Sequence, residues 1–156
     1  MPATHTNKTR LLTAAGWGAV ATLAMSALML LGTATGVSPM PDPIPAALVS
    51  HILGALPVPA TLGLAALAHL SYGAAAAVAL ALFASRVTVW VGAGYGVLLW
   101  ALMGLVWLPY LGWGPFGSAI TAKIALMTLL LHMVYGVTLG LLLDRHATPR
   151  DAVARA

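Results

Sequence analysis

Four long apolar segments constrain this chain more than any other feature of its sequence. They cover roughly residues 11–36, 60–84, 87–111 and 119–143. A helix that crosses the hydrocarbon core of a bilayer needs about 20 mainly apolar residues, and each segment is long enough. Lipid cannot satisfy free backbone N–H and C=O groups, so segments of this kind fold as helices. The sequence therefore predicts an all-α membrane protein with four transmembrane helices.

The composition supports a single membrane domain over residues 1–156. Hydrophobic residues make up 61% of the chain and charged residues only 6%, which lies far outside the averages of soluble domains. The seven Lys and Arg residues lie at or near the ends of apolar segments, so we interpret them as orientation signals and not as a face that binds nucleic acid. The chain has no cysteine, which excludes disulfides, thiolate ligands and thiol catalysis.

The positions of the basic residues predict how the chain is oriented. Lys8 and Arg10 precede the first apolar segment, Arg86 separates the second from the third, and Arg150 follows the fourth. The positive-inside rule places all of these sites on the cytoplasmic side of the membrane. We therefore predict that both termini are cytoplasmic and that residues 144–156 form a cytoplasmic tail.

The outer loop after the first segment predicts a further, shorter helix. Asp42 followed by Pro43 is a helix-start signal, because Asp is an N-cap acceptor and Pro needs no N–H donor. Apolar residues then recur every four positions, at Ile44, Leu48, Ile52 and Leu56. We expect an amphipathic or re-entrant helix over residues 43–56, which is too short to span the membrane. His51 lies within it as an interfacial side chain.

An internal duplication organises the four segments. The pattern Leu-x-His-x-x-Tyr-Gly occurs in the second segment and again 63 residues later in the fourth. The matching pairs are Leu67 and Leu130, His69 and His132, Tyr72 and Tyr135, and Gly73 and Gly136. Gly16-Trp17-Gly18 in the first segment likewise matches Gly94-Tyr95-Gly96 in the third. We predict two tandem helical hairpins, over residues 11–85 and 87–143, related by a pseudo-two-fold axis along the membrane normal.

The repeated histidines and tyrosines form the predicted polar cluster of the bundle. His69 with Tyr72, and His132 with Tyr135, have an i, i+3 spacing that places each pair on one helical face. Ionisable residues deep in a membrane are energetically expensive and are therefore candidates for function. No carboxylate is predicted at this depth. This argues against transport through a buried acid, paired-carboxylate hydrolysis and Mg²⁺-dependent phosphoryl transfer, and no catalytic residue is identified.

Several hypotheses remain open for this cluster. In the first, the side chains hydrogen-bond neighbouring helices and lock the hairpins together. In the second, His69 and His132 are axial ligands of a b-type haem, or they hold a metal ion or a quinone. In the third, they line the path of a small solute transporter or channel. A square of four helices places these two histidines on a diagonal, which suits something held between them unless Trp100 fills the space.

Small residues predict where the helices pack. Lipid gives helices no hydrophobic drive to associate, so close contact through small residues supplies the attraction. Small-xxx-small patterns of this kind contain Gly73, Gly92, Gly96, Gly136 and Gly140. They predict either tight packing within one bundle or a homodimer interface.

Three stretches of the chain carry a resemblance to a known family. They are the Gly-x-Gly of the first segment running into Ala-Thr-Leu-Ala-Met-Ser, the Pro-rich outer segment, and the final Leu-His-Met-Val-Tyr-Gly. They resemble a family of small uncharacterised bacterial proteins built of four helices in the inner membrane. The resemblance implies a location in the cytoplasmic membrane and transfers no activity. We expect a non-enzymatic accessory or binding protein, whose partners are the lipid bilayer and other membrane proteins or a second copy of the chain.

Overall fold

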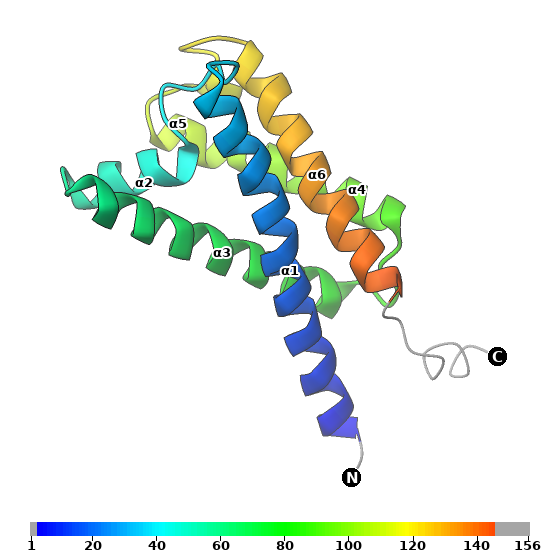
Figure 1. The fold of residues 1–156 in the computed structure, drawn as a ribbon. Helices are drawn as coiled ribbons and strands as arrows, with labels where there is room; N and C mark the ends of the chain where they lie inside the picture. Colours follow the sequence, from blue (N-terminus) through cyan, green and yellow to red (C-terminus); the bar gives the residue numbers. More distant parts are fainter. Residues whose placement is uncertain (1–2, 146–156) are drawn as a thin grey trace.

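The computed structural model describes residues 3–145, and every regular element in that range is a helix (Figure 1). Four helices are long and apolar enough to cross a membrane, so this part of the sequence prediction is confirmed. Three of them are α1 (Ala3–Ala34), α3 (Val58–Phe83) and α6 (Lys123–Arg145). The remaining one starts with α4 (Val89–Leu102). The predicted cytoplasmic tail from residue 146 onward, which contains Arg150, lies outside the described residues.

The third spanning helix changes its winding before it ends. α4 continues into a π-helical turn, η1 (Met103–Trp107), and then into α5 (Leu108–Tyr110). At the end of the π-helical turn an N–H donates to a carbonyl five residues earlier instead of four. Pro109 has no N–H, and its ring crowds the carbonyl one turn before it, which accounts for the wider winding. The three elements together form one apolar helix long enough to span.

The two outer loops contain short helices. The first holds α2 (Ile44–Leu53), and the second holds the 3-10 turn η2 (Pro115–Gly117). The prediction that Asp42 caps the helix of the first loop is wrong. This helix, α2, begins at Ile44 instead of residue 43, so Pro43 occupies the N-cap position, and no side chain caps the helix. The helix also ends earlier than predicted. Gly54 has a φ of 76° and a ψ of −164°, a conformation that glycine adopts readily and that no helix can continue through.

The spanning helices form two closely packed pairs. α1 packs on α3, α4 packs on α6, and α1 also packs on α6, while α2 packs on α3 (Figure 1). Over the described residues, α3 and α4 have no comparable contact with each other. The predicted square of helices is therefore open on one side. Long side chains bridge that side, since the Tyr95 hydroxyl of α4 donates to the Ala76 carbonyl of α3 over 2.8 Å.

Glycines set the spacing inside both pairs. A Cβ at Gly96 of α4 would clash with the backbone of α6 at His132, and one at Gly136 would clash with the backbone of α4 at Gly92. In the other pair, a Cβ at Gly18 of α1 would clash with the backbone of α3 at Gly73. The helices of each pair therefore approach so closely that these positions admit only glycine. The small residues considered for a homodimer thus face another helix of the same chain.

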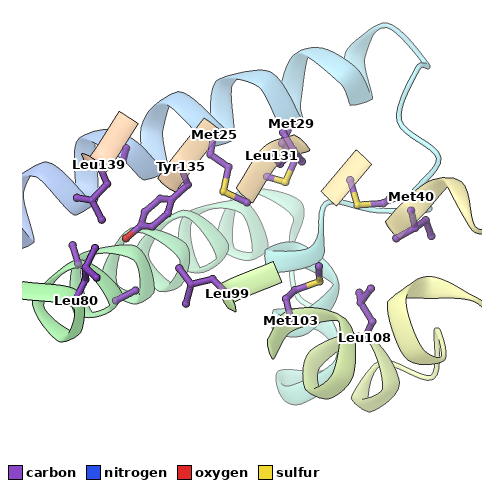
Figure 2. Packing of buried hydrophobic residues seen from close by; sticks show 14 of the residues in the cluster. Met25, Met29, Met40, Leu80, Leu99, Met103, Leu108, Leu131, Tyr135 and Leu139 are labelled. Atoms are coloured by element: carbon purple, nitrogen blue, oxygen red, sulfur yellow. The ribbon is translucent and has the colours of Figure 1, made fainter. Parts of the chain in front are cut away.

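Methionine and leucine side chains fill the space among the helices (Figure 2). Met25 and Met29 project from α1 into the same cluster as Leu99 and Met103 of the third span and Leu131 of α6. Methionine is unbranched and flexible, so it fills irregular gaps that branched side chains leave. The interior is consequently apolar and adaptable around the residues that form the candidate site.

Candidate functional site

A cavity of about 350 Å³ opens among α1, α2, α3, η1 and α6. Its wall is mostly aliphatic and includes four methionines. The polar side chains in the wall are few: His69 and Tyr72 from α3, Thr128 and His132 from α6, and the Trp107 indole from η1. Both histidines of the predicted cluster therefore line one cavity, although they belong to different helix pairs.

His132 has a defined hydrogen-bonding role. Its side chain is buried, and its Nδ1 lies 2.7 Å from the Thr128 carbonyl oxygen one turn earlier on α6. A carbonyl oxygen can only accept, so Nδ1 carries the hydrogen and donates it. In a neutral imidazole the other nitrogen, Nε2, is then left as an acceptor.

His69 has a less restrictive partner. Its Nδ1 lies 3.1 Å from the Ser26 hydroxyl oxygen of α1. A hydroxyl can donate or accept, so this hydrogen bond permits either tautomer of His69. The contact also ties α3 to α1 at the level of the cavity.

The two tyrosines of the cluster take separate positions. Tyr135 is buried, with 3% of its surface exposed, and its hydroxyl donates to the Gly73 carbonyl of α3 over 2.6 Å. It does not line the cavity and instead joins α6 to α3. Tyr72 lines the cavity, is 40% exposed and lies against the Trp107 side chain.

The helix α2 covers one side of the cavity. Ile44, Leu48 and Ile52 line it, which is the apolar periodicity seen in the sequence. His51 projects elsewhere, and its ring packs edge-on against Tyr110 of α5 at a centroid distance of 4.9 Å. The outer-loop residue Asp42 is exposed. Neither His51 nor Asp42 lines the cavity.

Trp100 does not fill the space between the two histidines. Its indole N–H donates to the Ala125 carbonyl of α6 over 3.0 Å, and its ring lies 4.6 Å from that of Phe116. Trp100 is absent from the wall of the cavity. The volume beside the histidines is therefore open to a ligand.

Sequence reasoning missed several residues of this site. Met25 and Met29 follow each other at i, i+4, and Thr128 precedes His132 by the same spacing, which indicates a shared helical face in each case. Ser26 carries no local signal. Its pairing with His69 depends on how two separate helices pack.

The residues present limit which cofactors the site suits. Within the described part of the chain, no group of three or more His, Cys, Asp or Glu side chains is placed to hold a metal ion. Two imidazoles suit the axial positions of a haem. However, among the described residues that line the cavity none is Lys or Arg, so nothing there pairs with haem propionates.

Four apolar helices around a largely apolar cavity are those of a multi-pass membrane protein with an internal cavity. The chain belongs to the Family of unknown function (DUF6789), whose family model matches residues 8–153. The resemblance to an uncharacterised family is thereby confirmed. Neither a curated protein nor a solved structure matches the chain.

Proposed function

We propose that this chain is a membrane-embedded binding protein that holds a lipid-soluble molecule in the cavity beside His69 and His132. The observation that carries the proposal is the cavity itself. Its volume of about 350 Å³ falls within the roughly 300–1,000 Å³ of small-molecule sites, which are mainly apolar with a few orienting polar groups. The cavity has this composition, and the bilayer supplies molecules that match it.

The orientation of the site follows from the charges at one end of the molecule. An Arg10 guanidinium nitrogen donates to the Ala84 carbonyl at the end of α3 over 2.6 Å, and Arg86 pairs with Asp144 at 3.3 Å. The positive-inside rule assigns this end to the cytoplasmic side. The α2 helix and the side of the cavity that it covers then belong to the outer half of the membrane, with the cytoplasmic membrane as the proposed location.

Two tandem hairpins are part of the same proposal. Gly18 and Gly73 meet where α1 crosses α3, and Gly96 lies against Gly136 where α4 crosses α6. These are matching positions in the internal duplication. Equivalent glycines at equivalent crossings support an origin of the bundle from one repeated hairpin.

Saturable photolabelling tests the binding function. The full-length protein in lipid nanodiscs is labelled with a long-chain aliphatic alcohol that carries a diazirine in its chain, and the labelled peptides are identified by mass spectrometry. We expect labelling of cavity residues such as Leu131 that an excess of the unmodified alcohol suppresses. Labelling of lipid-facing residues should not be suppressed. The probe reaches them from the bilayer without occupying a site for which the unmodified alcohol could compete.

A matched pair of variants locates the labelling. Ala68 lines the cavity, so Ala68→Trp fills it and is expected to abolish the saturable component. Ala66 is exposed on the same helix and does not line the cavity, so Ala66→Trp is expected to retain it. Saturable labelling that survives Ala68→Trp, or is absent from the wild-type protein, would disprove the proposed function.

A b-type haem carrier is a second candidate because of one feature of His132. Histidines that bind a metal commonly donate their other ring N–H to a carbonyl, as His132 does to Thr128. An absorption spectrum of the purified protein decides this: a Soret band that is lost in both His69→Ala and His132→Ala supports haem. A colourless, folded protein excludes it.

A further inference from the structure

We infer that the ligand of this cavity is an uncharged molecule with a hydroxyl group, and that this hydroxyl donates its hydrogen to Nε2 of His132. The inference rests on the proposed function and names the chemical class of its ligand. It combines three features of the cavity: the fixed tautomer of His132, the other polar side chains that line the same cavity and the lack of charged side chains in the wall.

The acceptor is defined by the hydrogen bond on the other side of the ring. Because Nδ1 of His132 donates to the Thr128 carbonyl, the neutral ring offers only an acceptor at Nε2. Within the described chain, Nε2 has no hydrogen-bond partner, yet no buried side-chain nitrogen or oxygen there is left unsatisfied. Nε2 is therefore not sealed by protein, and the space it reaches is the cavity that His132 lines.

A donor on the ligand is consequently required at this position. Ketones, ethers and esters have acceptors only and would leave Nε2 unpaired in an apolar surrounding, which is costly. A hydroxyl supplies the donor and keeps two lone pairs of its own. The Tyr72 hydroxyl and His69, which also line the cavity, are able to donate to those lone pairs, since the Ser26 contact leaves the His69 tautomer free.

The charge of the ligand follows from the rest of the wall. Among the described residues that line the cavity, none is Asp, Glu, Lys or Arg. A buried charge without a partner is strongly unfavourable, so neither an ammonium nor a carboxylate group suits the site. The four methionines of the wall, Met25, Met29, Met40 and Met103, adapt to many apolar shapes. Selectivity therefore depends on the polar end of the ligand.

The experiment compares two probes that differ only at that end. One is the photoreactive long-chain alcohol used above, and the other is its methyl ether. Both are applied to the full-length protein in nanodiscs, and the concentration for half-maximal saturable labelling of cavity peptides is measured. We expect the ether to bind roughly tenfold more weakly or worse, because it leaves a buried acceptor without its partner.

Replacement of the acceptor should remove this preference. In His132→Phe the alcohol should bind no more tightly than the ether, and the ether should bind at least as tightly as it does to the wild type, because it no longer buries an unpaired acceptor. Leu130→Phe introduces the same ring two residues away at an exposed position that does not line the cavity. That control should keep the full preference for the alcohol.

A spectroscopic measurement keeps the inference testable if His132→Phe fails to fold. Nitrogen-15 NMR of the wild-type protein should show Nε2 of His132 as the unprotonated nitrogen, with a resonance that shifts on addition of the alcohol but not of the ether. Saturable labelling by both probes with equal affinity would overturn the hydroxyl inference and leave the binding function standing. Absence of saturable labelling by either probe would overturn the binding function itself.

Discussion

The two copies of the His-x-x-Tyr-Gly pattern share their spacing but differ in their surroundings. His69 pairs with a side chain on a neighbouring helix, the Ser26 hydroxyl, whereas His132 pairs with a carbonyl of its own helix. Tyr72 is 40% exposed, while Tyr135 is 3% exposed and hydrogen-bonded to Gly73 of α3. The first copy thus has adaptable polar groups, and the second has fixed ones.

The difference arises from the helix that faces each histidine. In the internal duplication, Ser26 of the first segment corresponds to Gly104 of the third. Gly104 has no hydroxyl, and the Phe116 ring lies where a side chain at that position would be. With no partner offered from across the interface, His132 donates to the Thr128 carbonyl instead. His69 thus faces a serine hydroxyl where the matching position of the second copy is a glycine.

The largest expected effect concerns the glycine crossing of the second pair. Gly96→Val places a branched side chain against the α6 backbone at His132 and forces α4 and α6 apart. Overpacking of this kind costs roughly 1–3 kcal/mol or more. We expect a clear drop in the temperature at which the detergent-solubilised protein loses its monodisperse peak in size-exclusion chromatography.

The neighbouring glycine provides the control for that variant. A Cβ at Gly94 meets no atom within 4 Å, so Gly94→Val adds the same side chain to the same helix without the clash. Its unfolding temperature should remain close to that of the wild type. Equal losses in both variants would mean that helix propensity or lipid contact, and not the α4–α6 crossing, sets the stability.

A smaller effect is expected from the buried tyrosine. Tyr135→Phe removes the hydrogen bond to the Gly73 carbonyl and should lower the free energy of unfolding by about 1 kcal/mol. Tyr72→Phe makes the same chemical change at the exposed copy and should change stability much less. Unfolding of both variants in a mixed-detergent titration measures the difference. If Tyr72→Phe proved the more destabilising, the division into a fixed and an adaptable copy would be wrong.

The sequence predicted the spans well because their length and apolarity are local properties. Each segment is long enough to cross a bilayer on its own composition, and no tertiary contact changes that. The end of α2 was predicted less well, because the apolar periodicity continues to Leu56 while the helix ends at Gly54, which has a positive φ. Glycine has a low helix propensity, and a short helix has few hydrogen bonds to offset it.

The candidate site was predicted only in part for a related reason. The repeated pattern identified His69 and His132, and the structure places both in one cavity. It gave the two tyrosines equal roles, which they do not have, because Tyr135 crosses to Gly73 while Tyr72 remains at the cavity. These roles depend on how α3 and α6, which lie diagonally across the bundle, approach each other. No spacing within one helix encodes that approach.

The smallest expected effect on stability concerns the serine beside His69, and it tests the comparison most directly. Ser26→Ala removes the only hydrogen bond that joins His69 to α1 in the described chain. Hydrogen bonds of this kind in membrane bundles contribute on average about 0.6 kcal/mol, so the fold should persist. Nitrogen-15 NMR should show altered ring resonances for His69 and unchanged ones for His132, whose partner is the Thr128 carbonyl of its own helix. A matching change at His132 would show that the two rings are coupled through the cavity, and the two copies would then form one polar unit instead of two independent ones.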